Sequence, residues 1–469
     1  MASNRRYDEP TSHPTNPSRE EAKGRSDLLG RRITRRALIK GSLAALAGAG
    51  GARIIAGDRP ASAAPAISKP VSIRYWTFLD PKDPGPRSVA QTQMLDLFKK
   101  KQPNINVVVE IAPWQTVDRQ LLQAAAAGRG PDVVRIFSQN LAMHIPTKTI
   151  LPLDDFFKHW TKEQREDFIF PWEDTVWNNQ KMAFYGDHRV RMLWYRADLL
   201  RAKNLKPPRT LEEVAQVAKA VMTDQIVGFG IGLSRGNNAT TLMEWFMPAL
   251  WGMGSRLLNP DETAFFNGEA GVRLFQWLQD MVYKYKVMPA GATAWTGDNL
   301  TDMFRGGVVA MTPQGTHRVA AGRAGKGIGK NLQTVPIPTD KADKPAAAYV
   351  AGQCYCISKD VKEKEAAWLL IEHLLSPEAE IINARVAGEM PTRKSTYKDP
   401  WFQTEEAADL REWRTYINEH GRSIRLPEKF LALSDFIAIA AQEVVGTQVS
   451  PKKALDEAAK KWHAEIGRD

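Results

Sequence analysis

Apolar and polar residues follow two different periods along the first part of the chain. Val71 to Trp76 alternates with a period of two, which is typical of a half-buried strand, whereas the stretch that follows repeats its apolar side chains at helical spacing. The expected order is strand 71–76, helix 87–101, strand 105–111, helix 117–127 and strand 132–137. Strands that alternate with helices in this way predict a parallel sheet and an α/β fold class.

A second unit is predicted to begin near residue 191, where another strand-like run opens. The expected elements are strand 192–195, helix 211–221, a glycine-broken strand 226–231, and helices 240–252, 270–286 and 451–466. From about residue 362 the pattern is mostly helical, apart from a break at 388–401. Stretches rich in proline or glycine at 206–209 and 322–345 favour loops.

The N-terminal segment has the layout of an export signal. A paired-arginine run at 34–40 leads into an apolar stretch at 43–55 and then small residues that end at Ala63. The run resembles the twin-arginine signal, which implies passage through the twin-arginine translocon and cleavage after Ala63. Residues 1–63 are thus expected to be disordered and then removed, which leaves a mature chain of 64–469.

The alternative for this segment is a basic amphipathic helix or a membrane anchor. The apolar stretch is interrupted by Arg53 and is shorter than the roughly 20 residues that a spanning helix needs. No cysteine stands near the cleavage point to accept a lipid. We therefore expect a soluble mature protein without a lipid anchor.

Charge and cysteine content restrict the possible partners. The chain has a formal charge of +11, but residues 1–63 hold 12 Lys and Arg against 6 Asp and Glu, so +6 leaves with the leader and about +5 remains. This balance gives no support to nucleic-acid binding. Cys354 and Cys356 lie on one strand-like run near the upper distance limit for a bridge, and they are too few for a metal site. Because no phosphate-binding loop, His-Glu-x-x-His motif or haem attachment pair is present, we expect no metal and no cofactor.

Seven short motifs occur in an order and spacing that unrelated α/β chains would seldom reproduce. They are Tyr75-Trp76-Thr77-Phe78, residues 98–105 (FKKKQPNI), residues 130–134 (GPDVV), residues 151–156 (LPLDDF), residues 193–200 (LWYRADLL), residues 304–311 (FRGGVVAM), and Ile357-Ser358-Lys359 followed by residues 365–368 (EAAW). Together they resemble the extracytoplasmic solute-binding proteins that feed ABC importers, in particular the branch typified by the maltose-binding protein.

This resemblance implies a two-lobed periplasmic-binding-protein fold of type II, with a hinge and a ligand cleft between discontinuous lobes. The first lobe is expected to hold 64–188 and 307–350, and the second lobe 189–306 and 351–469. It also implies a monomer in the periplasm that delivers a carbohydrate or related polyol to ABC permease subunits by cleft closure.

Candidate ligand contacts combine aromatic planes with polar side chains, because a sugar presents apolar C–H faces and a rim of hydroxyl groups. Fourteen tryptophans are present, and Trp76, Trp114, Trp251 and Trp295 fall at loop-like positions, although at least half of these are expected to pack in the core. Matching the family's motifs, and the rule that ligands bind at strand C-termini, gives the remaining cleft positions. These are Phe78, Asp80, Phe137, Ser138, Gln139, Asn140, Asp187, His188, Arg189, Arg191, Gln314, Thr316, His317, Gly352 and Gln353.

One departure from the family pattern bears on the ligand. The resemblance implies an acidic residue two positions before Arg191, and this chain has Arg189 there. A cation cannot accept a hydrogen bond from a hydroxyl group. Asp187, on the same strand face, is one substitute. Alternatively, Arg189, Arg191 and His317 form a fork for the carboxylate or phosphate of an acidic sugar or sugar phosphate.

A hydrolase is the rival from another functional class. Gly232-Leu233-Ser234-Arg235-Gly236 satisfies the nucleophile-elbow pattern, and His317 or His373 is a candidate base. The segment is rich in glycine throughout, so a five-residue match arises easily by chance. We expect a binding protein and not an enzyme.

Overall fold

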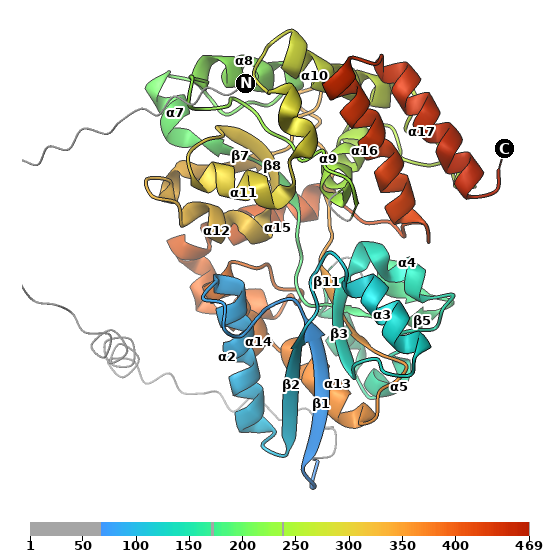
Figure 1. The fold of residues 1–469 in the computed structure, drawn as a ribbon. Coiled ribbons are helices and arrows are strands. Elements are labelled where there is room, and N and C mark those ends of the chain that lie inside the picture. The colour runs from blue at the N-terminus through green and yellow to red at the C-terminus, as the bar shows by residue number, and fades with distance from the viewer. Residues whose placement is uncertain (1–66, 170–172, 237–238, 469) are drawn as a thin grey trace, which may run out of the picture. The chain divides into compact units, whose positions relative to one another are not determined.

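A computed structural model describes residues 67–169, 173–236 and 239–468, which all belong to one compact unit of the chain (Figure 1). The twin-arginine run and the expected cleavage point lie outside the described residues. The strands are β1 (Val71–Thr77), β2 (Ile105–Ile111), β3 (Val133–Phe137), β4 (Val176–Trp177), β5 (Gln180–Lys181), β6 (Phe184–Tyr185), β7 (Arg191–Arg196), β8 (Met311–Gly315), β9 (Leu332–Pro336), β10 (Ala348–Tyr349), β11 (Gln353–Ile357) and β12 (Gly421–Arg422).

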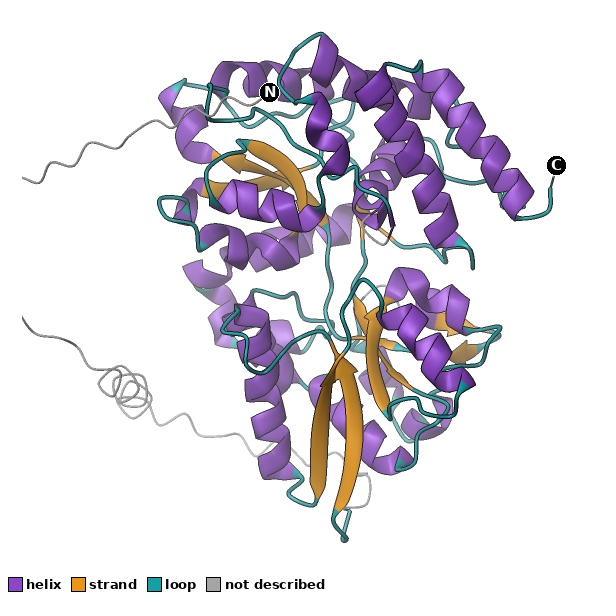
Figure 2. Cartoon of the chain, in the orientation of Figure 1, coloured by secondary structure: helices purple, strands orange, loops and turns teal. Residues whose placement is uncertain are grey.

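Helices surround these strands (Figure 2). The α-helices are α2 (Pro86–Lys101), α3 (Val117–Ala126), α4 (Leu141–His144), α5 (Asp154–Phe157), α6 (Lys162–Glu166), α7 (Ala197–Ala202), α8 (Leu211–Val221), α9 (Ala239–Gly252), α10 (Glu269–Tyr283), α11 (Gly297–Arg305), α12 (Val319–Arg323), α13 (Lys364–Leu374), α14 (Pro377–Ala387), α15 (Ala408–His420), α16 (Phe430–Thr447) and α17 (Pro451–Glu465). The short 3-10 turns that concern the site are η1 (Ser138–Asn140), η2 (Glu173–Thr175), η4 (Ala290–Ala294) and η5 (Thr316–Arg318).

The first sheet has the strand order β2-β1-β3-β11-β6. β1 pairs in parallel with both β2 and β3, as the alternating pattern predicts. β11 pairs antiparallel with β3 and β6, so β3 and β11 are interior strands. The side chains of β3 and β11 are almost all buried, whereas β1, which is also an interior strand, buries every second residue. α2 packs against α14 and α13 beside this sheet, and together these elements form the first lobe.

The second sheet has the order β8-β7-β9 and forms the second lobe with α7 to α12 and α15 to α17. β7 pairs antiparallel with both β8 and β9. The expected division of the chain between lobes is therefore wrong in two segments. β8 and β9, from the segment 307–350, lie in the second lobe, and β11, α13 and α14, from the segment 351–469, lie in the first.

Two local predictions also fail. Residues 226–231 form no strand, only isolated bridges of Ile226 with Thr223 and of Val227 with Val309. Close packing on α8 explains this: a Cβ on Gly228 would lie 2.4 Å from the Ala218 carbonyl oxygen. The stretch 322–345, expected as a loop, contains β9, whose partner β7 is distant in sequence.

Within the described residues, α16 is the one helix long and apolar enough to cross a membrane by length and composition. Half of it is buried, and its buried residues Leu433, Ile437, Ala441 and Val444 belong to the largest apolar core of the second lobe. The Tyr283 hydroxyl also donates to the Val445 carbonyl at 2.6 Å. These contacts are those of a core helix.

Three segments run side by side between the two lobes. Residues 186–190 and 350–352 connect the lobes directly, and residues 388–390, which follow α14, lie beside them. The His188 N–H donates to the Met390 carbonyl at 3.0 Å, and Arg189 and Ala351 exchange two backbone hydrogen bonds of 2.7 and 3.0 Å. Backbone that pairs in this way gives a connection with few freely rotating residues, which we call the hinge.

Candidate functional site

A cavity of about 320 Å³ is lined by residues from both lobes and from the hinge. This volume is at the lower end of the range for small-molecule sites. The lining residues of the first lobe lie on the loops after β1 and β2, the start of α2, η1 and β11; those of the second lie on α9, α11, η5, α12, β10 and α16. The wall consists of Phe78, Leu79, Asp83, Gly85, Pro86, Arg87, Ser88, Trp114, Phe137, Gln139, Asn140, Arg189, Val190, Arg191, Thr240, Thr241, Glu244, Asp298, Thr301, His317, Arg318, Ala320, Ala321, Tyr349, Ala351, Gly352, Gln353, Ala387 and Leu431.

Three aromatic rings form one side of this wall in the first lobe. Phe78 and Phe137, each at the C-terminal end of a parallel strand, have ring centroids 6.5 Å apart and nearly parallel planes. Trp114 meets Phe137 edge-on at 5.9 Å. Because β1 and β3 pair in register, the residues that follow them are brought to the same edge of the sheet. The result is an apolar platform beside polar groups.

Carboxamide groups stand next to this platform. Gln139 and Asn140 follow β3 directly, and Gln353 begins β11, which pairs with β3. Within the described part of the chain, Gln139 Oε1, Asn140 Oδ1 and Gln353 Nε2 are buried without a hydrogen-bond partner. Buried polar atoms are normally paired, so these three atoms are the expected points of contact for a polar ligand or water.

The hinge side of the wall contains a buried network of arginines and carboxylates. Arg189 Nε lies 2.6 Å from Asp187 Oδ1, and Arg135 donates to Asp187 Oδ2 at 2.6 Å. Arg87, from the start of α2, places Nε 2.7 Å from Glu389 Oε1. Burial opposes ionisation of Asp187, but Arg189 and Arg135 outweigh it and lower the pKa of Asp187 to about 2.

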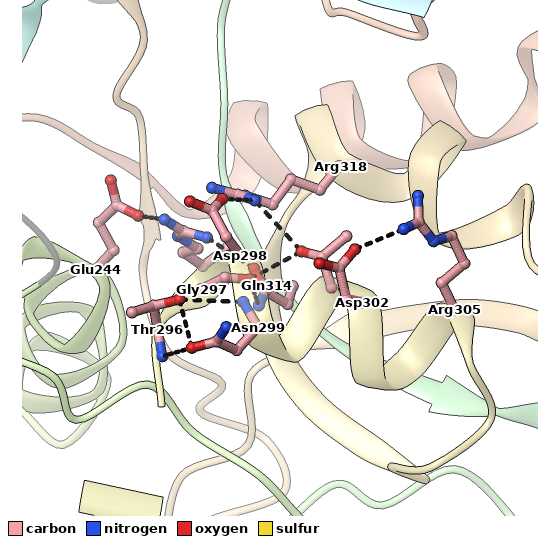
Figure 3. A network of polar contacts seen from close by, with 11 residues as sticks. Glu244, Thr296, Gly297, Asp298, Asn299, Asp302, Arg305, Gln314 and Arg318 are labelled. Atoms are coloured by element: carbon pink, nitrogen blue, oxygen red, sulfur yellow. Dashed lines mark hydrogen bonds and ion pairs between the residues drawn. The ribbon is translucent and has the colours of Figure 1, made fainter. Parts of the chain in front are cut away.

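A second set of ion pairs lies at the start of α11 (Figure 3). Arg318, from η5, pairs with Asp298 in the first turn of α11, and Arg191 pairs with Glu244 of α9. Gln314 Nε2 donates to the Gly297 carbonyl at 2.9 Å and holds α11 against β8. Thr296 caps the same helix in a capping box with Asn299.

All four arginines of the cavity wall are therefore ion-paired. Burial, together with the neighbouring arginines, lowers the pKa of both Arg87 and Arg191 to about 9. Burial and the same cations lower the pKa of His317 well below its usual value. The positive charges in the wall are thus balanced by carboxylates, and His317 adds none at neutral pH.

Comparison with known proteins identifies the family to which the chain belongs. A family model described as bacterial extracellular solute-binding protein matches residues 93–409. The chain belongs to this family. A Brucella abortus protein described as a binding protein is 21% identical over 374 residues, covering 78% of this chain and 87% of the relative. The sn-glycerol-3-phosphate-binding periplasmic protein of Pectobacterium atrosepticum is 20% identical over 414 residues, covering 84% and 91%. The structure of maltose-bound MalE3 of T. maritima superimposes with a TM-score of 0.74 at 23% identity, covering 84% and 99%.

About half of the candidate contact residues of this extracellular solute-binding protein line the cavity. They are Phe78, Trp114, Phe137, Gln139, Asn140, Arg189, Arg191, His317, Gly352 and Gln353. In the alternative fork of Arg189, Arg191 and His317, both arginines are paired with carboxylates of the protein.

The other predicted contacts lie outside the cavity wall. Trp76, Asp80, Ser138, Asp187, His188, Trp251, Trp295, Gln314 and Thr316 are all in this group. Trp76 donates through Nε1 to Glu110 at 2.6 Å, and Asp80 accepts from the Lys82 N–H at 2.8 Å in a surface turn. Trp251 and Trp295 pack in or against the core of the second lobe.

The remaining residues of that group are used for structure. Asp187 and His188 are buried in the hinge, and Gln314 supports α11. Thr316 donates its backbone N–H to the Val190 carbonyl at 3.0 Å, and the Ser138 N–H donates to the Gly352 carbonyl at 3.1 Å. None of these five side chains lines the cavity, and they support its wall from behind.

Sequence reasoning missed several residues of the wall. Arg87, Glu244 and Asp298 lie in the first turns or first half of helices, and Arg318 follows His317 directly. The rule that residues after strand ends reach the cleft, applied one turn further into each helix, would have found Arg87 and Arg318. Glu389, which pairs with the wall residue Arg87, belongs to the third hinge segment; the break predicted at 388–401 marks that segment but does not place it in the hinge.

The glycine-flanked Ser234 does not form a nucleophile elbow. Its N–H donates to the Trp295 carbonyl at 3.0 Å, and among the described residues no histidine hydrogen bonds with it. His373 lies in the first lobe and donates to the Met94 carbonyl at 2.8 Å, while His317 lines the cavity, where Ser234 does not. The strand–turn–helix context that the motif requires is absent from residues 226–236.

Cysteine and metal-ligand side chains are also accounted for in the described ranges. Cys354 and Cys356 are buried free thiols on β11, and burial raises the pKa of both thiols. No group of three or more His, Cys, Asp or Glu side chains in these ranges is arranged to hold a metal ion.

Proposed function

We propose that this protein is a periplasmic receptor that binds a neutral carbohydrate or related polyol in the cavity and delivers it to an ABC importer. The cavity carries the proposal: it joins an aromatic platform to buried carboxamides, and its walls come from two lobes connected by a hinge. Aromatic faces suit the C–H surface of a sugar, and carboxamides suit its hydroxyl groups.

The balance of charge supports a neutral ligand over an acidic one. Each arginine of the wall already has a carboxylate partner, so an anionic ligand would have to compete with Asp187, Glu244, Asp298 or Glu389. The relatives leave both ligand classes open, because one is named for sn-glycerol 3-phosphate and another is bound to maltose. An acidic sugar or sugar phosphate is therefore the alternative outcome of the binding assay.

Closure of the cavity follows from its construction. A ligand that touches both walls stabilises the arrangement in which the walls approach, and bending of the three hinge segments releases it. In the periplasm such a receptor needs an export signal and a membrane partner. We propose that the twin-arginine leader supplies the first and that ABC permease subunits are the second, with the receptor acting as a monomer.

We further propose that the ligand is bound without chemical change. The hydrolase alternative predicts that purified protein cleaves an activated ester and that Ser234→Ala abolishes this turnover. We expect no turnover above the buffer rate in either protein. A rate lost specifically in Ser234→Ala would support the enzyme instead.

A thermal-shift screen tests the proposed function. The mature chain 64–469 is melted with maltose, glucose, ribitol and mannitol, and with glucuronate and glycerol 3-phosphate as acidic probes. A solute at 100 times its Kd stabilises the folded state by about 2.7 kcal/mol, which raises the Tm of a chain of about 400 residues by about 3 °C. We expect such a shift from a neutral solute. A shift from the acidic probes alone would establish the alternative, and a flat response across a wider sugar and polyol panel would refute the receptor.

A further inference from the structure

The carboxamide of Asn140 has an orientation that the protein itself fixes. Asn140 ends η1 at the cavity wall, and its Nδ2 donates to Asp118 Oδ2 at 2.6 Å. An ionised carboxylate only accepts hydrogen bonds, so the NH₂ group must face Asp118 and the carbonyl oxygen must face away from it. Asn140 is thereby presented as an acceptor.

The other carboxylate oxygen of Asp118 also has a hydrogen-bond partner. His144 Nε2 lies 3.0 Å from Asp118 Oδ1, and His144 Nδ1 lies 2.8 Å from the Thr149 hydroxyl oxygen. With the hydroxyl donating to Nδ1, the ring donates from Nε2 to the carboxylate. The chain Thr149–His144–Asp118–Asn140 thus runs from the interior of the first lobe to the cavity wall, and each donor in it has one acceptor.

Burial excludes a catalytic role for this chain of hydrogen-bonded side chains. Asp118, His144 and Thr149 have the composition of a nucleophilic triad, yet they are 2%, 0% and 3% exposed. A nucleophile must reach its substrate, and the Thr149 hydroxyl is enclosed behind the wall. The arrangement is built to hold Asn140 and not to react.

The far end of the chain is the one atom left without a partner. Asn140 Oδ1 is buried and, within the described residues, accepts no hydrogen bond. A buried carbonyl in this condition is costly, and the cost is removed when a donor from the cavity pairs with it. A hydroxyl group is such a donor, whereas a carboxylate or phosphate oxygen would be repelled by Oδ1, because both atoms are acceptors.

We infer that Asp118, supported by His144, is a positioning residue that locks Asn140 as a hydrogen-bond acceptor and so selects a ligand with a donating hydroxyl group at this wall. This inference rests on the proposed function and deepens it, because it names the residues that reject an anion at the aromatic end of the cavity. The residues act through Asn140 and do not touch the ligand.

A double-mutant cycle with matched probes tests this inference. Binding of glucose and glucuronate, and of glycerol and glycerol 3-phosphate, is measured by calorimetry for the wild type, Asp118→Asn, Asn140→Ala and the double variant. An asparagine at 118 can offer its amide oxygen or nitrogen, so Asn140 becomes free to turn. We expect Asp118→Asn to weaken the neutral probe about tenfold, or 1.4 kcal/mol, and to shift the neutral-to-acidic affinity ratio toward the acid by a similar factor.

The decisive comparison is made in the Asn140→Ala background. There, Asp118→Asn is expected to change affinity by less than twofold, because the group it positions is gone. An equal loss in both backgrounds would show that Asp118 acts only on the structure of the lobe. If Asp118→Asn does not fold, Thr149→Val loosens the same hydrogen-bond chain from its interior end, and we expect an affinity loss of about threefold that again requires Asn140. An equal loss in the Asn140→Ala background would overturn the inference.

A measurement without ligand separates this inference from the proposed function. In protein labelled with ¹⁵N-asparagine, the side-chain amide protons of Asn140 are expected to exchange with solvent at least tenfold faster in Asp118→Asn than in the wild type. Unchanged exchange would refute the positioning role even if sugars bind. Faster exchange in a protein that binds none of the probes would support the positioning role and count against the proposed function.

Discussion

Glu389 is one of the two carboxylates that pair with the buried arginines of the hinge, the other being Asp187. Glu389 is 2% exposed and faces Arg87 at 2.7 Å and Arg189 at 3.6 Å. In Glu389→Gln, the three arginines 87, 135 and 189 would share Asp187 as the one remaining carboxylate of the network. Breaking a buried pair from one side costs about 3–5 kcal/mol. We expect the lower end, about 3 kcal/mol, because the Arg87 side chain is 23% exposed and can turn toward solvent.

The assay is thermal unfolding of residues 64–469 at pH 8, a pH that favours the ionised form of Glu389, because burial and Asp187 raise its pKa. For about 400 residues the unfolding entropy is about 0.85 kcal/mol per degree, so 3 kcal/mol lowers the Tm by about 3–4 °C. Glu378→Gln is the matched control, because Glu378 pairs with Lys101 on the exposed surface, and we expect a change below about 1 °C. Equal small changes in both variants would show that Glu389 is not an ionised partner in the native hinge, and the charge argument would fail.

Three further outcomes are expected. Burial, more than the nearby arginine Arg414, lowers the pKa of His188 to about 3. Between pH 6.5 and 3 the unfolded chain therefore binds a proton that the folded chain does not, so the unfolding free energy decreases as the pH is lowered, by about 5 kcal/mol at most. Urea titrations at several pH values measure this decrease, and His188→Asn should flatten it. Trp114→Ala should weaken the best solute of the thermal-shift screen about tenfold by calorimetry, whereas Trp401→Ala, outside the cavity wall, should not. Gly352→Ala would place a Cβ 2.1 Å from a hinge carbonyl oxygen and should lower the unfolding free energy by about 1–3 kcal/mol, while Gly291→Ala, which meets open space, should leave it unchanged.

The elements of the fold were readable from the sequence where the pattern is local. The strand 105–111 and the helix 211–221 have the bounds that their apolar periods predict. The sequence did not show to which lobe the later strands and helices belong, because these elements pack on parts of the fold that come much earlier in the chain. β8, β9 and β11 pair with strands more than 100 residues away, and apolar strands of this kind carry no local mark of their partner.

The candidate site shows the same contrast between residues that a local pattern predicts and contacts that only the fold reveals. Phe137, Gln139 and Asn140 were predictable because a residue directly after a parallel strand must reach the ligand edge of the sheet. Trp76 was misplaced because its side chain bonds with Glu110 on the neighbouring strand, which only the register of β1 and β2 reveals. The pairing of Arg189 with Asp187 likewise needed the fold, since sequence alone permitted either a free fork for an anion or a neutralised pair.

A crystal structure of residues 64–469 with the solute that gives the largest thermal shift would show whether the cavity is the binding site. We expect an intact solute inside the cavity, its ring or chain against Phe137 and Trp114 and a hydroxyl group donating to Asn140 Oδ1, with residues of both lobes in contact. A solute bound on another surface, or held by one lobe alone, would contradict this expectation.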